Sequence, residues 1–266
     1  MLDFAAKTDV GHRAGENEDS IGWDVEKKIW LVADGMGGHA AGSTASTVAR
    51  RSLLAADPSK TTATQLVEAH EAIVAAAAEN SERAGMGSTV VVARVAGSTA
   101  EISWVGDSRA YLWRGGELRQ LTRDHSFIEV LRAQGILTEE QLRADPRSNL
   151  VTQTLGLGDP QPSVISESLR FGDWILLCSD GLNDEVEDAQ IAAILAGSSD
   201  VASAVDELVR VALNNGGRDN TSVIIVEFKG RRGLGFLWRL LDSRWLPLII
   251  GAILAVIFAL VLWVSH

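Results

Sequence analysis

The sequence predicts an α+β fold, in which antiparallel sheets are covered by helices, followed by one transmembrane helix at the C-terminus. Three observations support this prediction. Runs rich in Val, Ile and Trp are separated by turns such as AGSTA and RGGE, which are too short to hold the crossover helix of a parallel sheet. Patterns with helical spacing lie between groups of these runs instead of after each of them. A long uncharged stretch, residues 245–263, ends the chain.

Strands are predicted where β-branched and aromatic residues are bounded by turn-forming residues. These runs are residues 29–33, 89–95, 100–105, 110–113, 174–178 and 221–228. Helices are predicted where apolar residues recur at helical spacing, as in LVEAHEAIVAAAAEN. The helical segments are about 41–56, 62–83, 125–134, 139–144, 188–196 and 199–214. Thr138 followed by Gln141 matches a capping box at the start of the fourth of them.

The composition limits the possible classes of protein. The chain has 266 residues, of which 46% are apolar, so a sizeable core can form. A formal net charge of −11 argues against general nucleic-acid binding. Cys178 is the one cysteine, so no internal disulfide can form, which fits a reducing compartment. Because Cys178 lies within an apolar run, we interpret it as a buried core thiol rather than a nucleophile.

The C-terminal stretch WLPLIIGAILAVIFALVLW has the length of a membrane span. At 1.5 Å per residue, a helix over residues 245–263 is roughly 28 Å long, close to the hydrocarbon thickness of a bilayer. Trp245 and Trp263 stand at its ends, where indole rings prefer the membrane interface. A buried core helix is the alternative, but a helix so apolar on every side would need a larger protein around it.

The basic residues before this stretch set its predicted orientation. They are Lys229, Arg231, Arg232, Arg239 and Arg244. By the positive-inside rule, the large N-terminal part lies in the cytoplasm, anchored to the cytoplasmic membrane by a single pass. We therefore predict a domain at 1–228, a basic juxtamembrane linker at 229–244 and a transmembrane helix at 245–263. The linker either lies on an anionic membrane surface or is a solvated spacer.

Five aspartates recur beside Gly, Asn or Ser at the ends of predicted strands. They are Asp19, Asp34, Asp107, Asp180 and Asp219. One such residue is usually a turn former or a helix cap, but five of them suggest a cluster. Converging carboxylates repel one another and require cations, and oxygen ligands without Cys favour Mg²⁺ or Mn²⁺. Two ions sharing a carboxylate would polarise a water molecule and hold a phosphoryl oxygen.

The glycine-rich segment VADGMGGH has two possible roles, as a phosphate-binding loop or as part of a metal site. It lacks the Lys-Ser/Thr of a nucleotide-binding P-loop and the spacing of a dinucleotide-binding loop. Next to an acid cluster, Gly35 would let its backbone carbonyl approach a metal closely. We therefore interpret the loop as part of the metal site.

Together these motifs resemble the PPM family of metal-dependent protein serine/threonine phosphatases, of bacterial type. In order, they are NEDS, VADGMGGHAAG, GSTVVV, WVGDSRAYL, LTRDHS, TLG, LLCSDGL and GGRDNTSVIIV. The resemblance covers about residues 3–228. It implies a β-sandwich of two antiparallel sheets flanked by helix pairs, with metals in a cleft at one end of the sandwich. It also implies hydrolysis of phosphoserine and phosphothreonine in proteins, with a Ser/Thr kinase and its substrates as partners.

The resemblance also implies roles for the aspartates and two Mn²⁺ or Mg²⁺ ions as cofactors. Asp34 would bridge the two ions, and the Gly35 carbonyl would support one of them. Asp180 and Asp219 would bind the other ion, and Asp19 would act on a metal through water. The implied catalytic set is Asp34, Asp180 and Asp219.

A weaker third ion is implied as well, with Asp107 and Asp180 as its ligands. Ser179, next to Asp180, is either a helper of that ion or a structural hydroxyl, and we favour the structural role. The segment 127–153 would form a flap beside the active site. Its arginines, Arg132 among them, do not identify a substrate.

Two positions depart from the family pattern. Arg13 lies one residue earlier than the phosphate-binding arginine of the pattern G-x-x-R-x-x-N-E-D. We interpret Arg13 as a guanidinium clamp for the phosphate and as part of the catalytic set, with a surface arginine as the alternative. Met36 stands where eukaryotic members have a histidine proposed to protonate the leaving group, and a thioether cannot donate a proton. His39 is a possible substitute, but we favour a loop-supporting role for it.

The resulting functional prediction is a membrane-anchored phosphoprotein phosphatase that reverses a Ser/Thr kinase. One alternative is a pseudophosphatase that binds a phosphoprotein without hydrolysing it. Another is a regulator phosphatase that acts on an anti-sigma-factor antagonist, which requires the same chemistry.

Overall fold

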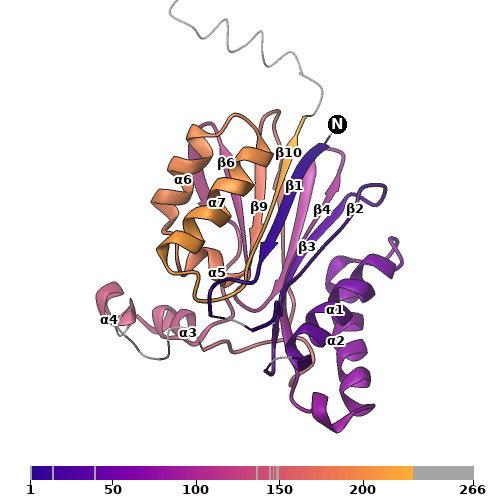
Figure 1. Ribbon diagram of the computed structural model, residues 1–266. Coiled ribbons are helices and arrows are strands. Elements are labelled where there is room, and N and C mark those ends of the chain that lie inside the picture. The colour runs from indigo at the N-terminus through magenta and orange to yellow at the C-terminus, as the bar shows by residue number, and fades with distance from the viewer. Residues whose placement is uncertain are drawn as a thin grey trace, which may run out of the picture. The chain divides into compact units, whose positions relative to one another are not determined.

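The computed structural model describes residues 2–13, 15–38, 40–135, 137–143, 145, 147 and 150–229. Met1–Lys229 forms one compact unit. In its described part, two antiparallel five-stranded sheets pack face to face, and helices cover both outer faces (Figure 1). This arrangement confirms the predicted sandwich of two antiparallel sheets flanked by helices.

Each sheet is built from strands that are distant in the sequence. The first has the order β1–β10–β9–β6–β7 and the second the order β2–β3–β4–β5–β8. The strands of the first sheet are β1 (Leu2–Asp9), β10 (Thr221–Phe228), β9 (Trp174–Cys178), β6 (Arg109–Arg114) and β7 (Glu117–Gln120). Those of the second are β2 (Ser20–Asp24), β3 (Ile29–Met36), β4 (Gly87–Ala96), β5 (Thr99–Val105) and β8 (Ser163–Ser168).

The helices fall into three groups. Two long helices pack on the second sheet, namely α1 (Ala40–Ala55) and α2 (Thr62–Ala78), and a short 3₁₀ turn, Ser81–Arg83, follows them. The first sheet is covered by α6 (Asp188–Gly197) and α7 (Val201–Asn215), which follow the single-turn helix α5 (Asp180–Asn183). The remaining two, α3 (Phe127–Gln134) and α4 (Glu139–Arg143), lie at one end of the sandwich (Figure 1).

The core has three apolar layers, because the central strands are buried on both faces. In β4, Val91 packs between the two sheets, whereas its neighbours Val90 and Val92 pack against α1 and α2. This alternation is the period-2 pattern of a strand. On the other side, α7 presents a regular apolar stripe to the first sheet, and its N-terminus is closed by a capping box between Asp200 and Ser203.

All six predicted strands form, and the four strands that were not predicted are the edges of the two sheets. These are β1, β7, β2 and β8. An edge strand has one unpaired side and is less buried, so its sequence carries more polar residues. In β8, for example, every residue is at least partly exposed. Apolar periodicity therefore identified the central strands and missed the edges.

Two further details correct the predictions. The strand predicted to end at residue 33 continues to Met36, because Asp34 and Gly35 pair with Thr89 and Ser88 in the β3–β4 ladder. The helix predicted over 62–83 stops at Ala78 and is followed by a separate 3₁₀ turn. The capping box is confirmed: the Thr138 N–H donates to Gln141 Oε1 and the Gln141 N–H to Thr138 Oγ1.

The predicted linker lies outside the described residues, Lys229 apart, and so does the whole of the predicted transmembrane helix at 245–263. None of the helices that the structure describes is long and apolar enough to cross a bilayer. The anchor therefore stays a prediction from the sequence.

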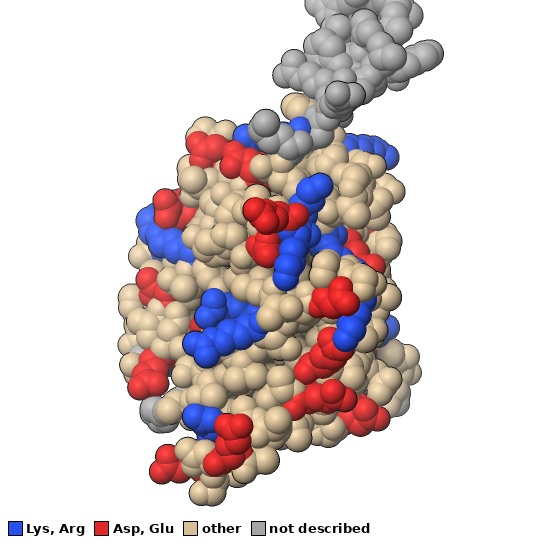
Figure 2. Space-filling model, turned by 90° about the vertical axis from the view of Figure 1, so that its right-hand side faces the viewer, with Lys and Arg blue, Asp and Glu red and all other residues tan. Residues whose placement is uncertain are grey.

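The surface carries charges of both signs. Figure 2 shows Lys and Arg side chains interspersed with Asp and Glu side chains on one face, without a large patch of a single sign. Exposed pairs such as Lys7–Asp206 and Arg210–Glu207 contribute little to stability, because water screens them.

One ion pair is more buried, and we predict a large effect from breaking it. The Arg114 guanidinium donates from Nε and Nη2 to Asp173, whose side chain is only 3% exposed. Changing Arg114 to Ala leaves this buried carboxylate with the Arg170 N–H as its remaining partner. We expect a loss of about 2–4 kcal/mol in the free energy of unfolding, measured by urea denaturation. The matched Arg210→Ala should cost under about 0.5 kcal/mol. Equal costs would contradict this interpretation.

Candidate metal centre and active site

The five predicted aspartates lie at one end of the sandwich. Asp34 is in β3, Asp107 in the turn between β5 and β6, and Asp180 at the start of α5. Asp19 directly precedes β2, and Asp219 lies two residues before β10. For Asp180, Asp107 and Asp219 the strand register explains this convergence, because the end of β9 lies beside the starts of β6 and β10: Cys178 pairs with both Arg109 and Val223. The structure thus brings together the acids that the sequence placed far apart.

Burial and mutual repulsion dominate the electrostatics of this acid cluster. Burial raises the pKa of Asp34 well above its usual range, and the charges of Asp19 and Asp180 raise it further. The pKa of Asp180 is raised in the same way, first by burial and then by the charges of Asp107 and Asp184. Carboxylates that crowd one another so closely favour either a bound proton or a bound cation.

Asp19 is held by a hydrogen bond from Ser179, which Ser222 holds in turn. Ser179 Oγ donates to Asp19 Oδ2 at 2.7 Å and accepts the Ser222 N–H at 3.0 Å. Burial raises the pKa of Asp19 to about 7, although the hydrogen bonds from Ser222 and Ser179 partly offset this effect. The charge of Asp19 in turn raises the pKa of Asp34. Ser179 is therefore a fully buried structural hydroxyl that orients an acid of the cluster, as we favoured from the sequence.

Asn220 joins the loop after β1 to the cluster. Its side-chain oxygen accepts the Glu18 N–H at 2.7 Å, and its amide donates to the carbonyls of Val10 and Glu16. Its own N–H donates to Asp219 Oδ1 at 2.7 Å. One buried amide thus connects the N-terminal motif, with Asp19, to the C-terminal motif, with Asp219.

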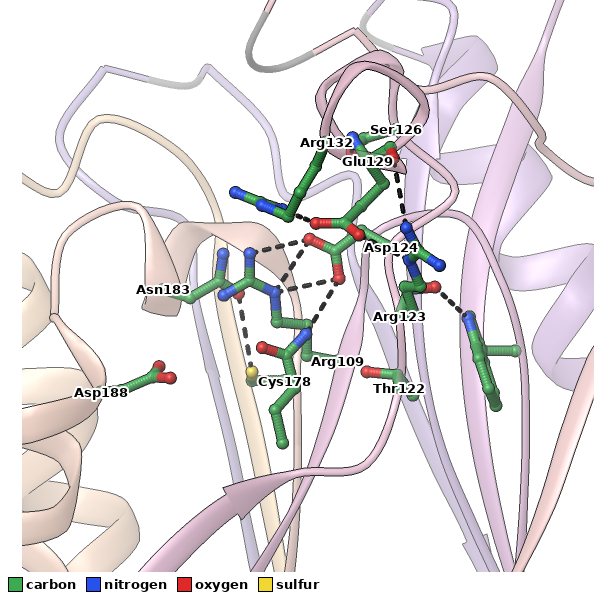
Figure 3. Close-up of polar contacts among 12 residues, drawn as sticks. Arg109, Thr122, Arg123, Asp124, Ser126, Glu129, Arg132, Cys178, Asn183 and Asp188 are labelled. Carbon is green, nitrogen blue, oxygen red and sulfur yellow. Dashed lines mark hydrogen bonds and ion pairs between the residues drawn. The ribbon is translucent and has the colours of Figure 1, made fainter. Parts of the chain in front are cut away.

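The nearby arginines do not neutralise the cluster. Arg218 is exposed and donates from Nε to Glu185 at 2.8 Å. Arg109 binds Asp124 with both Nε and Nη2, the shortest of these contacts being 2.7 Å (Figure 3). Burial and, after it, the charge of Asp124 raise the pKa of Asp107 to about 6, and the charge of Arg109 offsets only part of this rise.

A cavity of about 820 Å³ adjoins the cluster. Asp107, Asp180 and Asp184 line it on the side of the sandwich, while Glu129 and Leu142 line it from α3 and α4. The segment predicted as a flap therefore lies beside the acids. Figure 3 shows Glu129 and Arg132 of α3 above the Arg109–Asp124 pair.

Asp184 is a residue of this site that the sequence reasoning did not single out. Burial raises its pKa, and its charge acts on both Asp180 and Asp107. It is the C-cap residue of the short helix α5, four residues after Asp180, so the i, i+4 spacing in SDGLND was the available signal.

The remaining predicted residues have varied environments. Arg13 is exposed, and its charge lowers the pKa of Glu185. Met36 is 40% exposed at the end of β3. His39 lies outside the described residues. Cys178 is fully buried, and burial raises the pKa of its thiol to about 12, which confirms the core interpretation.

The chemistry of the acid cluster fits divalent cations. Asp19 Oδ1 and Asp180 Oδ1 are buried and have no hydrogen-bond partner. Gly35 lies so close to α1 that a Cβ there would be 2.1 Å from the Gly42 carbonyl oxygen, so only glycine fits. Within the described residues, no three His, Cys, Asp or Glu side chains are already arranged to hold an ion. The fit therefore depends on crowding and on unpaired oxygens, and not on a preformed coordination shell.

Comparison with known proteins identifies relatives of this chain. A family profile described as Protein phosphatase 2C matches residues 2–129. The chain is 35% identical over 234 residues to the serine/threonine protein phosphatase PstP of Mycobacterium tuberculosis, covering 85% of this chain and 45% of PstP. It is 36% identical over 236 residues to the serine/threonine phosphatase stp of Listeria innocua, covering 83% of this chain and 94% of stp. The chain thus spans about half the length of PstP and nearly all of stp.

A solved structure agrees in fold. The crystal structure of the catalytic domain of PstP in complex with two manganese ions is similar with a TM-score of 0.76 and 33% identity, covering 85% of this chain and 97% of that one. Sequence and structure therefore support the same assignment as the ordered motifs, and the chain belongs to the protein phosphatase 2C family of serine/threonine protein phosphatases.

Proposed function

We propose that this protein hydrolyses phosphoserine and phosphothreonine in proteins, and that it does so with two Mn²⁺ or Mg²⁺ ions held by the acid cluster. The observation that carries the proposal is the convergence of five aspartates, four of them buried or partly buried, two of which keep an unpaired buried oxygen. The manganese ions named for the PstP catalytic domain support the choice of cation.

In this proposal each acid has a defined role. Asp34, whose pKa is raised by the charges of both Asp19 and Asp180, would be shared between the two ions, with the Gly35 carbonyl beside it. Asp180 and Asp219 would hold the second ion. When bound, the ions supply the positive charge that activates water and stabilises the developing charge on the phosphoryl oxygens.

The chain's own residues orient and enclose this site. Ser179 fixes the orientation of Asp19, and Asn220 fixes the backbone on both sides of the cluster. Asp107 and Asp180 would take a third, weaker ion, and Asp184 lines the adjoining cavity beside them. The flap segment at α3 and α4 borders the same cavity, where a phosphorylated side chain would bind in this proposal.

The experiment that tests the proposal is phosphate release from a phosphothreonine peptide by the purified full-length chain. We expect turnover with Mn²⁺ and none with EDTA. Asp180→Asn should remove activity, whereas Asp206→Asn, at an exposed ion pair, should keep it. No turnover in the wild type with Mn²⁺, or full turnover in Asp180→Asn, would overturn the proposal. Tight peptide binding without hydrolysis would instead indicate a pseudophosphatase.

We further propose that Arg13 binds the substrate phosphate, since it lies on the loop that Asn220 connects to the cluster. Arg13→Ala should then raise KM for the phosphopeptide about tenfold, with a smaller change in kcat, because a charge-assisted contact is lost. Arg218→Ala, at an exposed arginine paired with Glu185, is the control and should leave KM unchanged. An unchanged KM in Arg13→Ala would contradict the phosphate-binding role and would support the alternative, a surface arginine without a role in the site.

We also propose that residues 245–263 anchor the protein to the cytoplasmic membrane, with the phosphatase domain in the cytoplasm, where it opposes a Ser/Thr kinase. The support is the uncharged 19-residue stretch and the basic residues before it. A soluble reporter fused to residues 229–266 should sediment with membranes and resist carbonate extraction. A reporter that stays in the soluble fraction would contradict the proposed membrane anchor.

A further inference from the structure

His125 makes a two-point contact with the turn that carries Asp107. The backbone N–H of His125 donates to the Gly106 carbonyl at 2.9 Å. The Gly106 N–H donates to the ring nitrogen Nδ1 of His125 at 3.2 Å. Both polar groups of the residue preceding Asp107 are therefore bound by one histidine.

This contact defines the state of the imidazole. Because Nδ1 accepts the Gly106 N–H, the ring proton of the neutral side chain is on Nε2, which lies 3.0 Å from Ser163 Oγ and donates to it. The ring stacks on Trp104 with 6.0 Å between the centroids and 25° between the planes. The imidazole is thus fixed on three sides.

The turn that His125 holds has little freedom to adjust. Gly106 has a φ of +104°, and a Cβ there would lie 2.5 Å from the Cβ of Thr89. On the other side of Asp107, Ser108 Oγ is 2.7 Å from Thr89 Oγ1. Asp107 is therefore flanked by two residues whose positions are fixed, one of them by His125.

The same histidine also holds the base of the flap. Its carbonyl accepts the Thr152 N–H at 2.7 Å and the Thr152 hydroxyl at 2.8 Å. Next to this pair, Ser126 forms a β-bridge with Val151, and the Phe127 N–H donates to the Leu150 carbonyl. The two ends of the flap segment therefore meet at His125, and one residue contacts both the flap and the Asp107 turn.

We propose that His125 is a positioning residue that couples the base of the flap to the carboxylate of Asp107. Movement of the flap when a phosphoprotein binds would then be transmitted through one residue to the side of the cavity where Asp107, Asp180 and Asp184 lie. The inference rests on the proposed function only in taking Asp107 as a cation ligand, and His125 itself touches neither substrate nor ion.

Two amide substitutions separate the contacts of the ring. His125→Asn keeps an acceptor near the position of Nδ1, where it can bind the Gly106 N–H. His125→Gln keeps a donor near the position of Nε2, where it can reach Ser163 but not Gly106. His125→Ala loses both ring contacts, the one with Gly106 and the one with Ser163. If the contact with the Asp107 turn is the one that matters, His125→Asn should behave like the wild type in Mn²⁺ binding and turnover. His125→Gln should then be as impaired as His125→Ala.

The test measures Mn²⁺ binding to the full-length variants by titration calorimetry, and separately kcat and KM with a phosphothreonine peptide. For His125→Ala and His125→Gln we expect the weakest Mn²⁺ site to lose about tenfold in affinity, as is typical when a group that orients a ligand is removed. We expect kcat to fall by a similar factor at low Mn²⁺ and to recover at high Mn²⁺. His125→Asn should stay close to the wild type, and His125→Ala should add nothing to Asp107→Asn.

An Asn variant as impaired as the Gln variant would overturn the inference, and so would additive effects of His125→Ala and Asp107→Asn. If His125→Ala does not fold, the comparison of Asn with Gln still decides. Should the chain prove inactive, hydrogen exchange remains informative, because Mn²⁺ should slow the amides of Gly106 and Thr152 together in the wild type but not in His125→Gln. Independent exchange of the two amides would also refute the coupling.

Discussion

Asp34→Asn is expected to lower kcat on a phosphothreonine peptide by about 10³-fold, because the stabilisation that bound cations provide is worth several kcal/mol. Asparagine has nearly the same shape as aspartate but no charge, so it cannot neutralise two cations. Asp34 is also the acid on which the other four act electrostatically, which is why we expect the largest loss there.

The same substitution should make the protein more stable when EDTA is present. Asp34 is buried among like charges, and removing its charge relieves both the desolvation and the repulsion. A gain of 1 kcal/mol corresponds to about 2–4 °C in Tm for a domain of this size. Asp206→Asn, at an exposed pair with Lys7, should change neither activity nor Tm appreciably. A less stable Asp34→Asn protein in EDTA would show that the carboxylate has a structural partner.

The second large effect is a pH dependence of stability that Mn²⁺ reverses. The pKa values of Asp34 and Asp180 are raised well above the usual range in the folded protein, and that of Asp19 is raised to about 7. The unfolded chain releases these protons near pH 4, whereas the folded chain keeps them until higher pH. With EDTA present, these groups therefore make the free energy of unfolding fall as the pH rises from about 4 to about 7.

Cations should compensate for this loss because they replace the protons. We expect the rise in Tm on adding Mn²⁺ to be larger at pH 7.5 than at pH 5.5, by differential scanning calorimetry of the full-length chain. Asp34→Asn should show a smaller rise at both values. A rise that is equal at the two pH values, or larger at pH 5.5, would contradict the assignment of the cluster as the cation site.

Most acids of the site could be predicted because they lie at an end of a central strand; Asp19, which precedes the edge strand β2, is the exception. Central strands are buried on both faces, so their apolar runs stand out, and Asp34, Asp107 and Asp180 are recognisable at their ends. The edge strands could not be predicted in this way, because their exposed sides admit polar residues, as in β8.

The residues that support the site were harder to foresee, since their roles depend on contacts between distant segments. Asn220 binds Val10, Glu16 and Glu18, about 200 positions away in the chain, and no local pattern predicts that pairing. Asp184 follows Asp180 at a helical spacing, but the surrounding segment gave no reason to expect a helix there. Arg109 and Asp124 lie in two motifs whose salt bridge emerges only when β6 and the segment after β7 meet.

The central claim is that the five aspartates form a cation site, and the most direct test is to count bound Mn²⁺. Equilibrium dialysis of the full-length chain at pH 7.5, followed by metal analysis, should give two tightly bound ions for the wild type. Asp34→Asn should bind fewer, and Asp206→Asn should bind the same number as the wild type. No bound Mn²⁺ in the wild type, or an unchanged number in Asp34→Asn, would contradict the claim.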